Sequence, residues 1–247
     1  MSMTSLSPET RTAIAASTEP VVLVTGASSG IGAATVIDLA ADHLVIAVAR
    51  NAERLEQVVA ASRPGAVIAV AVDLTDFAAV AEAVADLPRL DALVNNAAVM
   101  FRTSGATLTP EQFRDMLDLN VVAPANLTRL LLPLLTTARG TIVFTGSGAS
   151  RNPVPHHIAY ASSKYALQGY TDSLRLELAG DGVRVTTVAP GPTATVGAYR
   201  MDGLPDDSAA GDRLDPATVA RSIRHAIDAP ADTQLTELWV RPRVERR

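Results

Sequence analysis

The sequence has no cysteine and a single lysine, and each shortage narrows the possible functions. Without cysteine the chain has no disulfide framework, no thiolate metal site and no cysteine nucleophile. The four histidines show no ligand spacing, so we expect no metal site. The other 20 basic residues are arginine, which makes the lone Lys164 worth attention, because only lysine offers a compact, deprotonatable ammonium.

Basic stripes and long apolar runs are also missing. The formal net charge is −5, which argues against a nucleic-acid partner. The most apolar stretch, Leu127–Leu135, is interrupted by Arg129 and Pro133 and is far shorter than the ~20 residues that span a bilayer. Residues 1–19 lack the apolar core of a signal peptide and are expected to form a flexible extension. We therefore expect a cytoplasmic protein without a membrane partner.

From residue 20 to residue 247, strand-like runs alternate with helix-like runs. Most strand-like runs are continuous and rich in Val and Ile, which is typical of strands buried on both faces of a parallel sheet. The alternation predicts the α/β class, with one doubly wound parallel sheet of about seven strands in a single domain over residues 20–247. The predicted strands are Val21–Val24, Leu44–Ala49, Val67–Val72, Ala92–Val94, Thr141–Phe144, Val183–Val188 and Leu235–Val240.

Local signals mark where several helices begin. Thr109 precedes Pro110, and Gln112 stands where it can close a capping box. Asp215 precedes Pro216 in the same way, and Thr75-Asp76 is another candidate start. The irregular segment Gly197–Asp212 is expected to be a long loop, of the kind that often covers a binding site.

A glycine-rich turn follows the first predicted strand. Gly26, Gly30 and Gly32 separate that strand from a run with helical periodicity. Strand, glycine turn and helix form the context of a dinucleotide site, because glycines let the backbone approach a pyrophosphate at the helix N-terminus. The alternative is a tight turn with no ligand.

The second predicted strand ends at Ala49-Arg50-Asn51, where NAD-binding proteins place an acid. A guanidinium at this point suits a 2′-phosphate, so we favour NADP(H) over NAD(H). Alternatively, Arg50 is a solvated residue at the start of a surface helix. Asp73 ends the third strand, where it either borders the adenine or caps the helix near Thr75.

Tyr160 and Lys164 lie four positions apart in the predicted helix Ile158–Leu178. Residues at this spacing share a helix face, so the phenol and the ammonium can meet. An ammonium beside a phenol favours the phenolate and lowers its pKa from ~10 toward neutrality. Such a phenol can donate and accept a proton.

In these features the chain resembles the short-chain dehydrogenases/reductases, specifically the NADP-dependent bacterial type of about 250 residues. The resemblance covers nearly the whole chain after Pro20, and it implies a Rossmann-type fold, carbonyl–alcohol chemistry on a small molecule, and a homotetramer or homodimer. The pieces that carry it are Thr25, Gly26, Gly30, Gly32, Asp73, Asn95-Asn96-Ala97, Asn120, Ser147, Tyr160, Lys164, Pro190-Gly191 and the final segment Leu235–Pro242.

The resemblance assigns catalytic roles to four residues. Tyr160 would be the general acid or base, and Lys164 would hold the nicotinamide ribose and lower the pKa of Tyr160. Ser147, thirteen residues before Tyr160, would bind the substrate oxygen, whereas the competing Ser150 has the wrong spacing. Asn120 would position a water linked to Lys164; alternatively, it is a buried side chain bonded to the backbone.

The expected cofactor contacts combine the glycine turn with the ends of later strands. Either Thr193 or Thr195 would meet the nicotinamide carboxamide. Three departures from the family pattern are Ala98, Gly146 and the loop Pro192–Val196, and none removes a catalytic group. The complete predicted set is Gly26, Ser28, Ser29, Gly30, Ile31, Arg50, Asp73, Leu74, Asn96, Ala97, Tyr160, Lys164, Pro190, Gly191, Thr193 and Thr195.

Two other function classes stay open at this point. A regulatory or scaffold protein could keep the fold and bind a nucleotide without turnover, although the intact Ser147, Tyr160 and Lys164 argue against it. A metal-dependent alcohol dehydrogenase is disfavoured because this sequence has no cysteine and its histidines show no ligand spacing. Near the site, His156 and His157 either line the substrate entrance or are solvated, and Arg102 or Arg151 could attract an anionic substrate.

Overall fold

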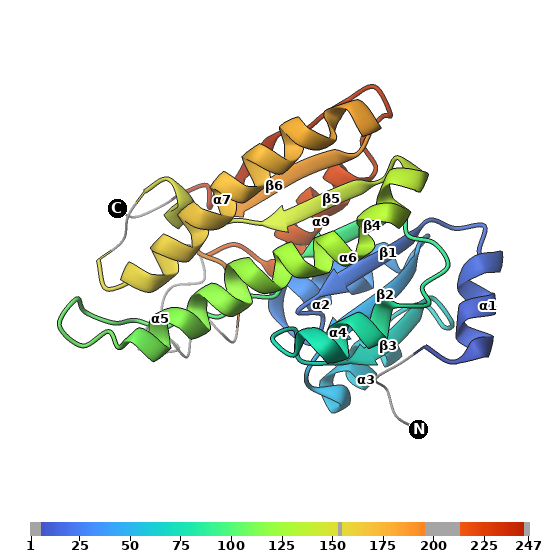
Figure 1. Cartoon of the computed structure of the whole chain (residues 1–247), viewed down its shortest axis with the longest axis horizontal. Helices are drawn as coiled ribbons and strands as arrows, with labels where there is room; N and C mark the ends of the chain where they lie inside the picture. Colours follow the sequence, from blue (N-terminus) through green and yellow to red (C-terminus); the bar gives the residue numbers. More distant parts are fainter. Residues whose placement is uncertain (1–5, 153–154, 196–212, 245–247) are drawn as a thin grey trace.

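The centre of the fold is a seven-stranded parallel sheet with the order β3-β2-β1-β4-β5-β6-β7 (Figure 1). The computed structural model describes residues 6–152, 155–195 and 213–244. All six strand pairings are parallel, so the predicted doubly wound sheet is confirmed. The strands are β1 Val21–Thr25, β2 Leu44–Ala49, β3 Val67–Ala71, β4 Ala92–Asn95, β5 Thr141–Thr145, β6 Arg184–Pro190 and β7 Glu237–Val240.

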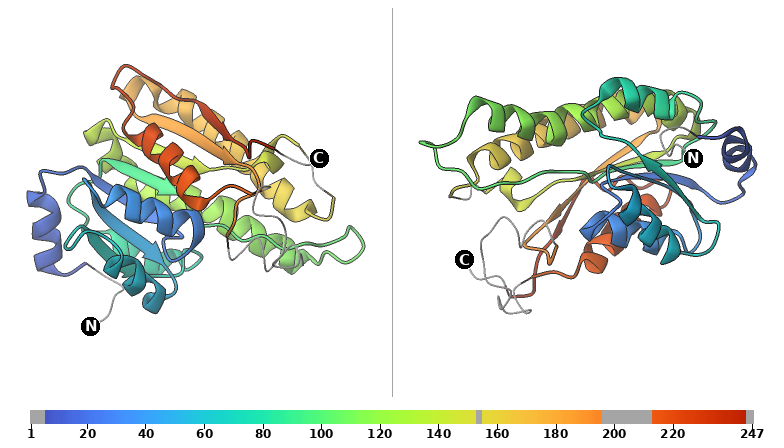
Figure 2. Two further views of the ribbon diagram at one scale, coloured as in Figure 1. Left: turned by 180° about the vertical axis from the view of Figure 1, so that it is seen from behind. Right: turned by 90° about the horizontal axis from the view of Figure 1, so that it is seen from below.

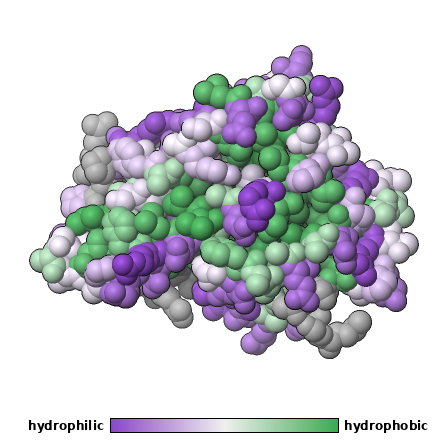
Figure 3. All heavy atoms as spheres, viewed as in Figure 1, coloured by the Kyte–Doolittle hydropathy of each residue, from purple (hydrophilic) through white to green (hydrophobic). Residues whose placement is uncertain are grey.

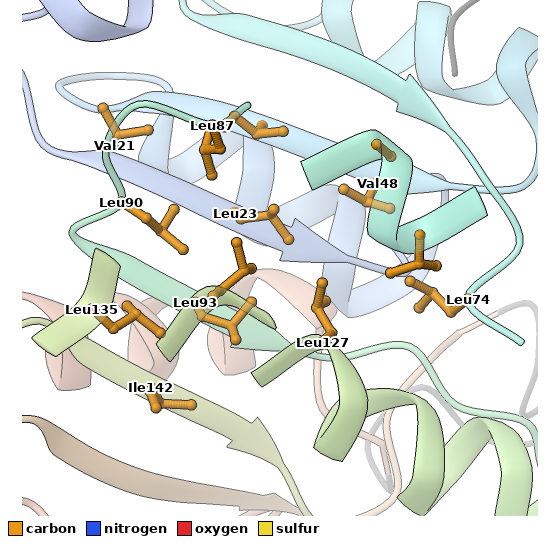
Figure 4. Close-up of a cluster of buried hydrophobic side chains, with 14 of the residues drawn as sticks. Val21, Leu23, Val48, Leu74, Leu87, Leu90, Leu93, Leu127, Leu135 and Ile142 are labelled. Carbon is orange, nitrogen blue, oxygen red and sulfur yellow. The ribbon is translucent and has the colours of Figure 1, made fainter. Parts of the chain in front are cut away.

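Helices cover both faces of the sheet, as Figure 2 shows from the side. One face carries α2 (Gly30–Leu39), α3 (Ala52–Ala60) and α9 (Pro216–Ile227). The other carries α4 (Phe77–Val84), α6 (Ala123–Ala138) and α7 (Ile158–Leu178). Each face therefore has its own apolar core, and Figure 4 shows part of the second, in which leucines of α6 pack on β1, β4 and β5.

The N-terminal segment differs from the flexible extension expected over residues 1–19. Residues Pro8–Ala16 form helix α1, and the Ser7 hydroxyl caps it by accepting from the Thr10 N–H. Ile14 is 0% exposed and joins the core beneath α4 and α6. The sequence pattern does not predict this helix, because a single buried side chain produces no apolar periodicity. Residues 1–5 of the predicted extension lie outside the described part.

The predicted helix starts are confirmed where local capping controls them. Thr109 and Gln112 form the capping box of α5 (Pro110–Leu117). Asp215 caps α9 and Asp76 caps α4 through their carboxylates. Helix α7 has the predicted bounds. The predicted long loop Gly197–Asp212 lies outside the described residues.

Helix α5 continues into α6 through a π-helical turn, Asp118–Val122. Within the described residues, the combined stretch 110–138 is the one helix whose length and mean hydropathy, 1.3, would allow it to cross a membrane. Its leucines at 127, 131 and 135 pack against the sheet and are at most 2% exposed. The apolar content of this stretch is therefore explained in part by the core.

Candidate active site

The strand order reverses between β1 and β4, and at such a switch point the carboxyl ends of the two strands border a crevice. Thr25, the last residue of β1, bridges the two ends. Its hydroxyl donates to Val94 O and accepts from the backbone N–H groups of Asn96 and Ala97 at 2.9 and 3.1 Å. Crevices of this kind are where open α/β sheets bind ligands.

The glycine turn fills one side of this crevice. Gly26 has φ +65°, and a Cβ there would lie 2.9 Å from Ala97 Cα. A Cβ on Gly32 would lie 2.2 Å from Gly26 O, so no larger residue fits without moving the backbone. Helix α2 begins at Gly30, and Ser29 makes no side-chain cap bond to its first N–H groups. The turn, which includes Ser28 and Ile31, thus presents a helix N-terminus suited to a phosphate.

Arg50 and Asp73 meet at the ends of β2 and β3. Arg50 Nη1 lies 3.4 Å from Asp73 Oδ2, and the Arg50 side chain is 71% exposed. Burial opposes ionisation of Asp73, but hydrogen bonds from Thr75 and the Arg50 charge together lower its pKa. Asp73 therefore forms the turn before α4, while Asp76 is the cap. The Leu74 side chain lies in the core, which leaves only its backbone for a cofactor contact.

Ser147, Tyr160 and Lys164 converge from β5 and α7. Ser147 follows β5 and caps a short 3₁₀ turn at Gly148–Ser150. Its hydroxyl hydrogen-bonds to the Tyr160 phenol. Lys164 Nζ lies 5.8 Å from the centre of the Tyr160 ring. The competing Ser150 is fully buried and donates to Ser147 O, so only Ser147 faces the phenol.

Burial dominates the charge states at this site. It raises the pKa of Tyr160, and the hydrogen bond from Ser147 opposes that shift only in part. Burial also lowers the pKa of Lys164 to about 8. In the protein alone the pKa of Tyr160 is thus raised, not lowered as expected, because desolvation of the phenolate outweighs the hydrogen bond from Ser147. Tyr160 is therefore a neutral phenol at pH 7.

Asn120 lies in the π turn and is 1% exposed. Its amide donates to Val99 O and to Ser163 Oγ, and its Oδ1 accepts from Val99 N–H at 2.8 Å. These bonds tie α7 and the loop after β4 together, as in the backbone-bonded alternative. The water role of Asn120 stays a prediction.

The loop after β6 closes the crevice from the other side. Gly191 N–H donates to Val240 O at 2.7 Å, and Thr193 Oγ1 donates to Gly191 O. The Thr195 methyl would lie 3.0 Å from a Cβ on Gly30, so this loop contacts the glycine turn. The structure therefore brings the predicted Pro190, Gly191, Thr193 and Thr195 to the same crevice as Gly26 and Asn96.

Three contacts at the site are not predicted by the sequence. They are the bridge that Thr25 makes to Asn96 and Ala97, the bond from Lys164 Nζ to Thr145 O, and the bond from Asn120 to Ser163. A threonine at the end of an apolar strand was the available signal for the first two.

His157 is half-buried and its ring packs edge-on against Tyr160 at 6.4 Å between ring centres, whereas His156 is exposed.

Comparison with known proteins decides the family. The profile described as short chain dehydrogenase matches residues 20–201. The chain belongs to the short-chain dehydrogenase/reductase family. It is 34% identical to a short-chain type dehydrogenase/reductase of Sinorhizobium fredii, over 90% of this chain and 91% of that one. It is 35% identical to sulfoacetaldehyde reductase 2 of Chromohalobacter salexigens, over 90% and 94%.

Solved structures of this family share the architecture. The closed form of serine dehydrogenase complexed with NADP⁺ has a TM-score of 0.81 and 28% identity, covering 92% of this chain and all of that one. Membership makes this chain an oxidoreductase of the short-chain dehydrogenase/reductase type. No group of three or more histidine or acidic residues able to hold a metal occurs within the described part of the chain.

Proposed function

We propose that this protein interconverts a small carbonyl compound and an alcohol with NADP(H). The observation that carries the proposal is the convergence of Ser147, Tyr160 and Lys164 beside the crevice between β1 and β4. Hydroxyl, phenol and ammonium are what proton transfer to a carbonyl oxygen needs, and the crevice is where a dinucleotide fits.

The residues of the crevice fit a nicotinamide dinucleotide. Gly26 and Gly32 leave no room for a side chain, and the start of α2 offers unbonded N–H groups to a pyrophosphate. The other residues expected to contact the cofactor are Ser28, Ser29, Ile31, Asp73, the backbone of Leu74, Asn96, Ala97, Pro190, Gly191, Thr193 and Thr195. When bound, the nicotinamide supplies or accepts the hydride.

The protein's own groups move the proton. In reduction, the Ser147 hydroxyl holds the carbonyl oxygen and Tyr160 donates its phenolic proton to that oxygen. In oxidation the Tyr160 phenolate accepts the proton back. Lys164, charged below its pKa of about 8, stabilises that phenolate and holds the ribose hydroxyls.

The activity is tested with a panel of aldehydes, ketones and alcohols, followed at the NADPH absorbance. The panel includes sulfoacetaldehyde and serine, because relatives act on them. We expect turnover of at least one compound, and its loss by about 10²-fold or more in Tyr160→Phe with NADPH binding retained. A Tyr160→Phe variant with the wild-type rate contradicts the mechanism. Tight NADPH binding without any turnover would instead favour a non-catalytic nucleotide-binding role.

The preference for NADP(H) depends on Arg50. No acid ends β2, and the exposed Arg50 guanidinium can turn from Asp73 to a 2′-phosphate. We expect NADPH to bind about tenfold or more tightly than NADH, and Arg50→Ala to remove most of that difference while NADH binding stays the same. Arg54→Ala is the matched control, since Arg54 is an exposed arginine on α3, four residues after Arg50. Equal binding of both cofactors by the wild type contradicts the preference.

The proposal includes assembly as a homodimer or homotetramer in the cytoplasm. Apolar side chains are exposed on the face that carries α6 and α7, where Figure 3 shows hydrophobic patches with hydrophilic side chains between them. Leu176 is 78% exposed, Tyr165 45% and Val122 42%. Such a patch is typical of a subunit interface. Light scattering measures the mass of the assembly, and Leu176→Arg should shift that mass toward the monomer. Cell fractionation tests the cytoplasmic location separately.

A further inference from the structure

The last strand, β7, ends beside the turn that carries Ser147. Arg241 follows β7 directly, and its guanidinium carbon lies 5.3 Å from the centre of the Trp239 ring. Stacking on an aromatic ring limits the orientations of a guanidinium. The Arg241 side chain is half-buried, whereas Arg243, two residues further, is exposed.

The same guanidinium contacts two glycines of the site. A Cβ on Gly148 would lie 2.6 Å from Arg241 Nη1 and 2.9 Å from Nη2. A Cβ on Gly191 would lie 3.2 Å from Nη1 and 3.1 Å from Cδ. Gly148 is the residue after Ser147, and Gly191 begins the loop after β6. A flat cation can lie against both backbones only because neither residue has a side chain.

The other end of β7 contacts the far end of the same turn. Arg151 follows the 3₁₀ turn, and its Nη2 lies 3.5 Å from Glu237 Oε2 on β7 and 3.7 Å from Asp172 Oδ2 on α7. The Arg151 side chain is 45% exposed, so these pairs contribute little stability alone. The turn after Ser147 is therefore contacted from both ends of β7, by Arg241 at Gly148 and by Glu237 at Arg151.

We propose that Arg241 is a positioning residue for Ser147. It packs the Ser147 turn against the loop after β6, and so it fixes the Ser147 hydroxyl relative to Tyr160. The inference rests on the proposed function, in which Ser147 holds the substrate oxygen. Because misplacing a reacting group by about 1 Å can cost 10²-fold in rate, a contact that does not touch the substrate can still control turnover.

Arg241→Ala tests the inference, with Arg243→Ala as the matched control. We expect kcat/KM for the carbonyl substrate to fall about 10- to 100-fold in Arg241→Ala, while the Kd for NADPH changes less than about threefold. Arg243→Ala should keep the wild-type values. Arg241→Lys keeps the charge but loses the planar group, so we expect a similar loss. Arg241→Lys also carries the test if Arg241→Ala fails to fold.

A double-mutant cycle separates positioning from general destabilisation. Single-turnover rates are measured for Arg241→Ala in the wild-type and in the Ser147→Ala background. If Arg241 acts through Ser147, its substitution should change the rate less than about twofold once Ser147 is absent. An equal loss in both backgrounds, or full activity in Arg241→Lys, overturns the positioning role of Arg241 and leaves the proposed function standing. A wild-type protein that turns over no carbonyl or alcohol overturns the proposed function, and this inference falls with it.

Discussion

The Lys164 ammonium donates a 2.9 Å hydrogen bond to the carbonyl oxygen of Thr145, the last residue of β5. Thr145 lies two residues before Ser147, so this bond ties α7 to the strand that presents the serine. Lys164 is 3% exposed. The single lysine of the chain therefore has two tasks, which are to link these elements and to place a cation beside Tyr160.

Lys164→Arg should lose activity although it keeps the charge. The guanidinium is larger and planar, and it cannot occupy the same buried space while donating to Thr145 O. We expect kcat/KM to fall about 10²-fold or more, close to the loss in Lys164→Met. Steady-state assays with a confirmed substrate check this, and Arg129→Lys serves as an exposed control. Full activity in Lys164→Arg would falsify the role of the ammonium.

The affinity for NADPH should weaken at alkaline pH. The pKa of Lys164 is lowered by burial to about 8, against 10.5 for an ordinary lysine. Below pH 8 the ammonium is charged and available to the cofactor. Above pH 8 the protein must take up a proton to restore it, so the Kd should rise by up to about tenfold per pH unit. Fluorescence titrations with NADPH from about pH 6 to about pH 10 check this, because they cover about two pH units on each side of the pKa of Lys164. Lys164→Met should bind weakly with a flat profile, and an equal slope in that variant contradicts the assignment.

Thr25→Val should destabilise the fold and the crevice together. The substitution preserves shape but removes the hydroxyl that accepts from Asn96 and Ala97 N–H. Each partner left without a hydrogen bond costs about 1–3 kcal/mol. We expect thermal and urea unfolding to show a loss of this size per bond, and the Kd for NADPH to rise. Thr25→Ser retains the hydroxyl and should stay close to the wild type. A Thr25→Val variant as stable as Thr25→Ser contradicts the bridging role.

Ile14→Ala should show that helix α1 is part of the folded unit. Ile14 is fully buried in the core shared with α4 and α6. Truncating such a side chain costs about 2–5 kcal/mol. Urea unfolding measures the loss, and Glu9→Ala, on the exposed side of the same helix, should change the stability by less than about 0.5 kcal/mol. If both variants unfold at the wild-type urea concentration, α1 does not contribute to the core.

Features controlled by neighbouring residues were predictable from the sequence. Helix α7 has the predicted bounds, and the capping box at Thr109 and Gln112 forms as expected. Strands β1 and β2 are fully buried runs rich in Val, as predicted, and Gly26 and Gly32 of the first turn lie where a Cβ would clash. In each case the pattern and its physical cause lie within a few residues of one another.

Features controlled by distant residues were not predictable. Asn120 bonds to Val99 and Ser163, 21 and 43 positions away. Arg241 contacts Gly148 and Gly191 across three strands. The direction of the Tyr160 pKa was also missed, because spacing places an ammonium nearby but does not show how much water the fold removes from the phenol.

The pairing of β1 with β4 has a consequence for how the chain acquires its site. Val22 pairs with Ala92, and the Val21 N–H donates to the Asp91 carboxylate 70 positions away. Contacts of such high sequence separation form slowly, because the entropy of closing the intervening loop must be paid before they stabilise the chain. The Thr25 bridge therefore cannot exist on a nascent chain that ends before β4. Binding of the dinucleotide would then mark the completion of folding, and refolding followed by NADPH fluorescence should lag behind refolding followed by helix content.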